Sequence, residues 1–239
     1  MTTAPGEFKK ALRAKRHRKR RTRWIVLGCA LLCLVLAGVG VWLVSFSSVF
    51  AATEVRVSGV SLLSEQQVSD TAAVELGKPL ANQDTDAIRE RVAGLAPVAE
   101  VSVERRFPHT IEITITERTL AYVWLDGDVP RWVDANGVVF HEGEKPAQGA
   151  VTAQVATPDQ RLLKDVATVV SAVVPLLGER ITLLQASAVD QIQVQLSDGD
   201  TVVWGSAEQS QLKAQVLSVL LSQEASVYDV SAPHAPTTR

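Results

Sequence analysis

The feature that most constrains this chain is a stretch of 21 uncharged residues at 24–44, which reads WIVLGCALLCLVLAGVGVWLV. A helix of that length spans about 31 Å, close to the ~30 Å hydrocarbon core of a bilayer. The 23 residues before it carry ten Lys and Arg and one acid, and basic flanks stay on the cytoplasmic side. The sequence therefore predicts a basic cytoplasmic tail (1–23), a transmembrane helix (24–44) and a large extracytoplasmic part from about Phe50.

A cleaved signal peptide is the alternative, because Val49-Phe50-Ala51 is similar to a peptidase site. The apolar core of a signal peptide is usually about 7–15 residues, however, and this stretch is longer. Arg20-Arg21 could indicate twin-arginine export, but more arginines and a Trp follow it. A retained anchor is the favoured interpretation.

Charge and cysteine are distributed unevenly along the chain. Residues 1–23 carry 10 − 1 = +9, which leaves 14 − 25 = −11 for the rest. Such a basic run could bind nucleic acid, but beside a membrane helix, topology and contact with anionic lipid explain it better. Cys29 and Cys33 both lie in the apolar stretch, so the external part has no disulfide and no thiol nucleophile.

The first external part, about 50–118, combines strand and helix patterns. Alternating apolar residues predict strands over 53–58, 99–103 and 111–115. Ser64 and Gln67 form a capping box that starts a helix, with Val68, Ala72 and Leu76 on its inner face. A second helix is predicted over 84–93. Together these elements predict a sheet with one apolar face covered by two helices.

The second external part, about 119–231, is also mixed. Short alternating runs predict strands over 122–125, 131–133, 138–140, 192–196, 201–204 and 227–230. Thr157-Pro158-Asp159-Gln160 predicts a helix start capped by Thr157, with an inner face that ends near Pro175. Ser206 and Gln209 predict the cap of a last helix. Its predicted inward residues are Leu212, Val216, Val219 and Leu220. Residues 142–156 show no clear pattern.

No catalytic or metal-binding motif stands out in the external part. The pairs Asp126/Asp128 and Asp198/Asp200 could be imagined as a general acid and base. Each pair flanks a glycine in a predicted turn, where Asp supplies local hydrogen bonds. The turn role is favoured, and the sequence predicts no catalytic residue, no cofactor site and no metal site.

The order of these segments resembles the FtsQ/DivIB family of bacterial cell-division proteins. The most specific stretch is 97–118, which reads PVAEVSVERRFPHTIEITITER. The other matching segments are 50–59, Leu63-Ser64-Glu65, Gly77-Lys78-Pro79-Leu80, 133–140, Asp198-Gly199, Lys213 and 228–233. Two segments depart from the family: Thr119-Leu120 stand where Pro is common, and 141–156 lack the usual Leu-Pro segment. The long basic N-terminus suits an actinobacterial member.

The resemblance implies an α+β fold with one transmembrane helix. Its parts would be a short basic cytoplasmic tail (1–23), the membrane helix (24–44), a POTRA domain of order β-α-α-β-β (50–118), a mixed α/β unit called the β domain (119–231) and a flexible tail (232–239). It also implies a non-enzymatic scaffold of the division machinery, without cofactors. Such a protein lies in the cytoplasmic membrane at the division septum, with its N-terminus in the cytoplasm.

The partners that the resemblance implies are FtsB-like and FtsL-like single-span proteins. Through them the protein would help recruit and regulate the septal peptidoglycan synthases, FtsW and its penicillin-binding partner. Two other functions are weighed against this one. A membrane-anchored cell-wall enzyme would need a catalytic group in a cleft, and a POTRA-type protein of polypeptide export would usually carry tandem POTRA units or a barrel.

The last predicted strand is the candidate partner site, because a strand at a sheet edge offers unpaired N–H and C=O groups to a partner segment. In the family the partner adds near the C-terminal end of the β domain. The predicted contact residues are Val227, Tyr228, Asp229, Val230 and Ser231, with specificity from the Tyr228 side chain. The alternative is that this strand only closes the sheet and Tyr228 packs inside.

Overall fold

The computed structural model describes every residue except 1–23, 25, 43–44, 46 and 144–148. The predicted basic tail lies outside the described residues, as do parts of the predicted membrane segment. Residues 26–42 are helical and their side chains are exposed. Within the described part of the chain, no helix is both long and apolar enough to cross a membrane.

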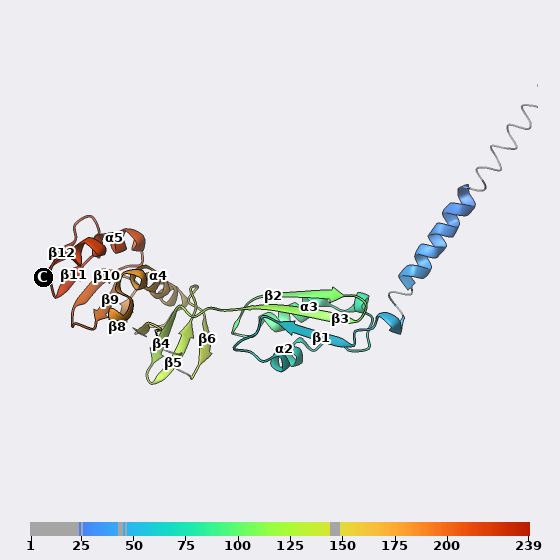
Figure 1. Cartoon of the computed structure of the whole chain (residues 1–239), viewed down its shortest axis with the longest axis horizontal. Helices are drawn as coiled ribbons and strands as arrows, with labels where there is room; N and C mark the ends of the chain where they lie inside the picture. Colours follow the sequence, from blue (N-terminus) through green and yellow to red (C-terminus); the bar gives the residue numbers. More distant parts are fainter. Residues whose placement is uncertain (1–23, 25, 43–44, 46, 144–148) are drawn as a thin grey trace, which may run out of the picture. The chain divides into compact units, whose positions relative to one another are not determined.

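The chain forms two compact units by its contacts, and its strands form two separate sheets (Figure 1). One sheet has three strands in the order β1-β3-β2, and the other has nine. The mixture of helices with two sheets agrees with the predicted α+β class.

The three-stranded sheet follows the predicted order β-α-α-β-β. Its elements are η1 (Ser48–Phe50), β1 (Glu54–Ser58), α2 (Glu65–Ala72), η2 (Leu80–Asn82), α3 (Thr85–Ala93), β2 (Val98–Arg106) and β3 (Thr110–Glu117). β1 pairs with β3 in parallel, from Glu54 opposite Thr110 to Ser58 opposite Thr114. The buried residues include Ile111 and Ile113 of β3 and Ile88 and Val92 of α3, as expected for an apolar sheet face covered by helices.

The start of α2 is predicted correctly and its end is not. The Gln67 N–H donates to Ser64 Oγ at 3.1 Å, and the Ser64 N–H donates to Gln67 Oε1 at 2.9 Å, which confirms the capping box. The helix ends at Ala72, because Ala73 has a φ of +45°. Leu76, predicted on the inner face, is 62% exposed as a result.

The nine-stranded sheet has the order β12-β11-β10-β9-β8-β7-β4-β5-β6. Its strands are β4 (Tyr122–Asp126), β5 (Val129–Val133), β6 (Val139–Glu142), β7 (Thr152–Val155), β8 (Ile181–Ala188), β9 (Gln191–Leu196), β10 (Thr201–Gly205), β11 (Val227–Asp229) and β12 (Thr237–Thr238). Strands β7, β8 and β12 were not predicted. β7 lies in the segment that showed no pattern, and β12 lies in the predicted tail.

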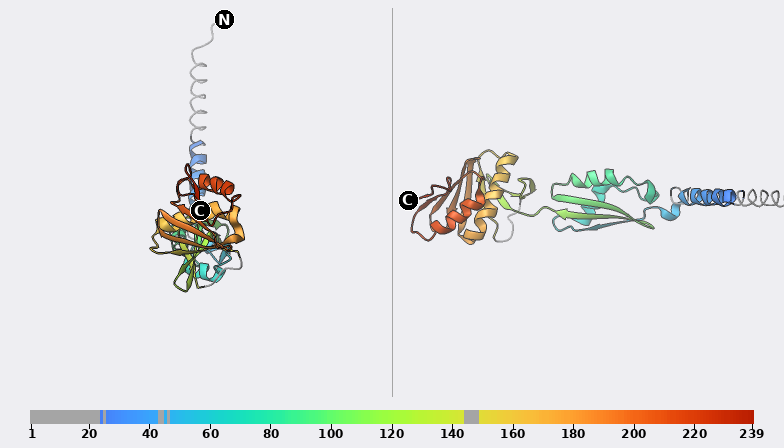
Figure 2. Two further views of the ribbon diagram at one scale, coloured as in Figure 1. Left: turned by 90° about the vertical axis from the view of Figure 1, so that its left-hand side faces the viewer. Right: turned by 90° about the horizontal axis from the view of Figure 1, so that it is seen from above.

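Two helices, α4 (Gln160–Leu177) and α5 (Ser210–Leu220), contribute to the core of this sheet, and η3 (Gly178–Arg180) follows α4. The helices lie side by side (Figure 2). The core joins residues of α4 such as Val166 and Val173 to Leu184, Val194 and Trp204 of the sheet. One face of the sheet is therefore packed against helices.

The predicted start and end of α4 are both shifted. Its N-cap is Asp159, whose carboxylate accepts the Leu162 N–H at 2.8 Å, so Thr157 is not the cap. The helix also continues through Pro175 to Leu177. Proline removes one helical hydrogen bond, but Val173 and Leu177 on either side of it are buried in the core, and this burial favours a continuous helix.

The inward face of α5 was predicted only in part. Val216 and Leu220 pack half-buried against the core, as predicted, and Leu212 is also half-buried. Val219 is 66% exposed, and the buried residues are Ser210, Lys213 and Leu217. Ser206 is not the cap, because the helix begins at Ser210 and its N-cap residue is Gln209. The Ser206 carbonyl accepts a hydrogen bond from Lys213. The apolar pattern therefore identified part of this face but not the two polar residues that are buried with it, Ser210 and Lys213.

Candidate partner-binding edge of the nine-stranded sheet

The predicted partner strand, β11, lies second from the end of the nine-stranded sheet. It pairs in parallel with β10 on one side, from Thr201 opposite Val227 to Val203 opposite Asp229. On the other side it pairs with β12 in antiparallel fashion, with Tyr228 opposite Thr238 and Asp229 opposite Thr237. The expectation that 227–231 form the edge is therefore wrong, because residues 237–239 return to cover it.

The main-chain groups of β11 are divided between its two neighbours. Toward β10, the Thr201 N–H donates to Ser226 O at 2.9 Å, and the Val230 N–H donates to Val203 O at 3.0 Å. Toward the tail, the Val227 N–H donates to Arg239 O at 3.1 Å, and the Arg239 N–H donates to Val227 O at 3.0 Å. The main-chain N–H and C=O of Val227 therefore point away from β10, toward the tail, whereas the N–H of Val230 points toward β10.

The side chains of the five predicted contact residues fall into two groups. Tyr228 and Val230 are buried, and the Tyr228 hydroxyl donates to Gln223 O at 2.9 Å. Val227 and Asp229 are half-buried and Ser231 is exposed. The Asp229 carboxylate accepts hydrogen bonds from the N–H and the hydroxyl of Ser231, at 3.0 and 2.7 Å. The alternative packing of Tyr228 inside the domain is therefore the observed one, and Tyr228 is not available for side-chain recognition.

The strand register places a largely polar row across the sheet beside this edge. Four polar residues and one valine stand opposite one another on neighbouring strands: Gln154, Gln185, Gln193, Val203 and Asp229. None of the five is buried, and their neighbours along the strands are the core residues. A shallow hollow of about 280 Å³ lies here, and its lining includes Gln185, Gln193 and Ser231. The accessible face next to β11 is thus rich in amides.

A buried lysine holds the connection between β10 and β11 in place. Lys213 of α5 is 2% exposed, and its Nζ donates to Trp204 O at 3.0 Å and to Ser206 O at 2.8 Å. The Trp204 indole N–H donates to Ser210 Oγ at 3.2 Å. Burial lowers the pKa of the Lys213 ammonium, and nearby Glu208 opposes that shift. Lys213 therefore links α5 to the end of β10, the strand that pairs with β11.

One member of each carboxylate pair that was weighed as acid and base forms an ion pair with an arginine. Asp198 Oδ2 is 2.7 Å from Arg180 and its other oxygen accepts the Asp200 N–H, while Asp126 lies 3.1 Å from Arg131. The Arg180 guanidinium, with the Asp200 N–H, lowers the pKa of Asp198. Among the residues that the structure describes, no group of three His, Cys, Asp or Glu side chains is arranged to hold a metal ion.

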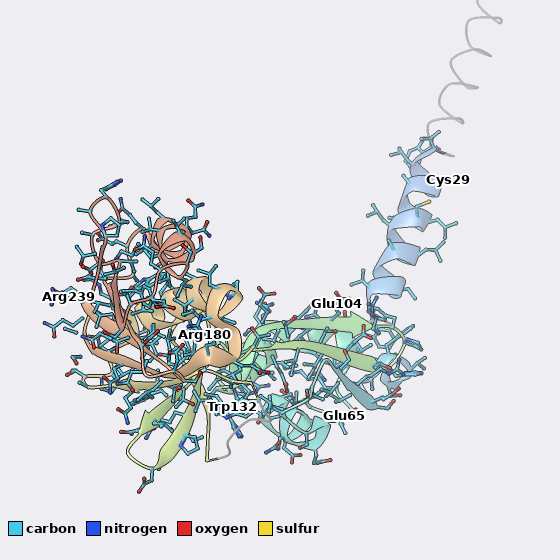
Figure 3. The ribbon with its side chains drawn as sticks, turned by 60° about the vertical axis from the view of Figure 1, so that its left-hand side comes forward. Cys29, Glu65, Glu104, Trp132, Arg180 and Arg239 are labelled. Carbon is cyan, nitrogen blue, oxygen red and sulfur yellow. The ribbon has the colours of Figure 1, made fainter. Side chains whose placement is uncertain are left out.

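Two parts of this region carried little signal in the sequence. Lys213 matched a family position, but a lysine on an amphipathic helix is ordinarily read as exposed. Residues 237–239 read Thr-Thr-Arg after two prolines, and only the β-propensity of the two threonines hinted at a strand. Figure 3 shows Arg239 at the outer margin of the unit that contains the nine-stranded sheet.

Known proteins match both sheets. A family model described as "POTRA domain, FtsQ-type" matches residues 50–118, and one described as "Cell division protein FtsQ/DivIB, C-terminal" matches residues 121–231. The Cell division protein FtsQ of Mycolicibacterium smegmatis is 34% identical over 216 residues, which cover 90% of this chain and 65% of the relative. The chain therefore spans slightly less than two thirds of that relative's length.

Relatives from Streptomyces are covered more completely. The Cell division protein FtsQ of Streptomyces venezuelae is 31% identical over 248 residues, covering 99% of this chain and 91% of the relative. That of Streptomyces coelicolor is 31% identical over 242 residues, covering 95% and 91%. These are actinobacterial proteins, in agreement with the resemblance seen in the basic N-terminus. The chain belongs to the FtsQ/DivIB family of bacterial cell-division proteins, which are non-enzymatic scaffolds of division.

Proposed function

We propose that this chain is a membrane-anchored scaffold that binds other division proteins outside the cytoplasmic membrane. Through them it helps recruit and regulate septal peptidoglycan synthesis. The observation that carries the proposal is the match of the two family models, in order, over 50–118 and 121–231. The accessible polar face beside β11 supports a binding role.

The proposed organisation has five parts. They are a basic cytoplasmic tail (1–23), a transmembrane helix (24–44), a POTRA domain (50–118), a β domain (119–231) and a C-terminal tail (232–239). The exposed apolar side chains of residues 26–42 and the basic residues before them support an anchor with its N-terminus in the cytoplasm. The protein would concentrate at the division septum.

The proposed partners are FtsB-like and FtsL-like single-span proteins, and indirectly FtsW and the septal penicillin-binding protein. The proposed contact is the segment of Val227, Tyr228, Asp229, Val230 and Ser231, and an extended partner segment adds as a strand to the main-chain groups of this segment that point away from β10. The accessible side chains of Val227, Asp229 and Ser231 would supply specificity. Because all partners are held in one bilayer, their effective concentration is high and each contact can be weak.

The test replaces Val227 in the full-length chain by proline and, as the matched control, by alanine. Proline removes the outward N–H that donates to Arg239 in the free protein, whereas alanine keeps it. We expect co-purification of the FtsB-like and FtsL-like proteins to be lost with Val227→Pro and kept with Val227→Ala. Circular dichroism checks that both variants remain folded.

Val230 is unsuitable for this test, because its N–H donates to Val203 O inside the sheet and proline there would disrupt the domain itself. If a folded Val227→Pro protein co-purified the partners as well as wild type does, the partner site would have to lie elsewhere than on β11. Failure of the wild-type chain to bind either partner would contradict the proposed partners.

A further inference from the structure

The outer edge of β11 already holds a strand, and that strand belongs to the same chain. Arg239 O accepts the N–H of Ser226 at 2.8 Å and that of Val227 at 3.1 Å, and the Arg239 N–H donates back to Val227 O at 3.0 Å. The Ser226 hydroxyl also donates to Arg239 O at 3.2 Å. We propose that residues 237–239 are an intramolecular placeholder on the partner-binding edge, which an incoming partner strand displaces.

The attachment of the placeholder is local and shallow. β12 has two residues, and no residue after Val230 is buried. By contrast, Tyr228 is 4% exposed and Val230 is fully buried, so β11 is held by the core and not by the tail. Segments with few buried contacts open at low free-energy cost while the rest of a domain stays folded. Residues 237–239 can therefore leave without unfolding the strand beneath them.

The placeholder also indicates what kind of segment the edge accepts. It runs antiparallel to β11, with Thr238 opposite Tyr228 and Thr237 opposite Asp229. Val227 and Arg239 exchange both of their main-chain hydrogen bonds, so in an antiparallel ladder the N–H of Thr238 points away from β11. A partner in this register would be an extended peptide with a residue other than proline opposite Val227.

This inference rests on the proposed function, because it concerns the same edge. A bound placeholder lowers the apparent affinity of a partner by the fraction of molecules in which the edge is open. A tethered segment competes at a high effective concentration, although this one makes few contacts. We expect removal of 237–239 to raise partner affinity by about three- to tenfold.

The first measurement is amide hydrogen exchange on the full-length chain and on the same chain ending at Pro236. Exchange at Ser226 and Val227 should accelerate in the shortened chain, because both N–H groups donate to Arg239. Exchange at Val230 should stay the same, because its N–H donates to Val203. Equal exchange at Ser226 and Val227 in the two proteins would overturn the placeholder.

The second measurement is binding of the FtsB-like and FtsL-like extracytoplasmic regions to Arg239→Pro and Thr238→Pro variants. Arg239→Pro removes the N–H that donates to Val227 and should raise affinity as the shortened chain does. Thr238→Pro removes an N–H that points away from β11 and should raise affinity less. If both variants bind like the wild type, the tail does not compete.

The two proposals can fail separately. If Val227→Pro abolished binding but removal of 237–239 did not raise partner affinity, the proposed partner site would stand and the placeholder would be overturned. Unchanged binding with Val227→Pro and with the shortened chain would overturn both, because the partner would then bind elsewhere.

Discussion

At the scale of single residues, Lys213 is the side chain on which the support of β11 most depends. It is almost fully buried and bonds two carbonyls at the end of β10. Replacing it by methionine keeps the length but leaves both carbonyls without this donor, which should lower the free energy of unfolding by about 1–3 kcal/mol. Urea unfolding measures this, with the exposed Lys164→Met as control. Equal losses in the two variants would contradict the role of Lys213.

Tyr122 should make stability depend on alkaline pH. Its hydroxyl donates to Leu163 O at 3.0 Å, and burial raises the pKa of the phenol above its ordinary value. Above pH ~10 the unfolded chain loses this proton while the folded chain keeps it, so stability falls as pH rises. The free-energy advantage of wild type over Tyr122→Phe, about 1 kcal/mol at pH 8, should therefore shrink by pH 11. A free-energy difference between the two proteins that stays constant with pH would refute this. Lys213, whose pKa is lowered, changes stability with pH in the opposite direction, but it does so equally in both proteins and does not affect the difference.

At the scale of elements, a single carboxylate holds the segment that leads into α2. Glu117, the last residue of β3, accepts the N–H groups of Ser61, Leu62 and Leu63 at 3.0, 2.8 and 2.9 Å. Burial raises the pKa of Glu117, but the hydrogen bonds from Leu62, Leu63 and Ser61 outweigh it, so the net pKa is lowered.

We therefore expect Glu117→Gln to cost about 1–2 kcal/mol of stability at pH 7. Because the pKa of Glu117 is lowered in the folded state, its contribution is present above pH ~4.3 and is lost as pH falls through the folded value. The stability difference between wild type and Glu117→Gln should therefore become smaller at acid pH. Thermal unfolding of both proteins between pH 7 and pH 3 measures this. Glu100→Gln, at an exposed position of β2, should change little at either pH.

The sequence predicted those elements whose own residues specify them. The Ser64 capping box and the alternation of Ile111, Ile113 and Ile115 depend on local chemistry, and both are found. β7 is specified by its position between β4 and β8, to which it pairs in parallel; four residues give too little pattern to show this. Only part of the inner face of α5 could be predicted. Val216 and Leu220 follow the apolar pattern, whereas Lys213 is buried because the carbonyls of Trp204 and Ser206, at the end of β10, accept its hydrogen bonds.

The strand that carries the candidate site was predicted, but its pairing was not. The strand 227–230 was expected, and Val227–Asp229 is β11, yet its exposed edge was not anticipated to be covered. The pairing depends on hydrogen bonds from Ser226 and Val227 to Arg239. These residues are brought together by the path of the whole chain, so the local sequence cannot predict their contact.

At the scale of the whole molecule, the proposed anchor determines how the protein behaves in cells. We expect the full-length chain to stay in the membrane fraction after alkaline carbonate washing and to need detergent for release. Leu34→Arg with Val35→Arg places two charges near the centre of 24–44, at about 2.5–3.5 kcal/mol each, and should abolish retention. The control replaces the same residues by alanine. Retention of the double-arginine protein would contradict a membrane-spanning segment.

The short strand β12 also bears on solubility. An uncovered strand edge pairs with other copies of itself, and natural sheets shield such edges with short strands or prolines. Here Thr237 and Thr238 cover β11, and Pro236 precedes them. A chain without these residues would present the same edge to a second copy, so its self-association should increase with concentration. Residues 237–239, which compete with a partner for the edge of β11, would then also prevent self-association of the protein before a partner binds.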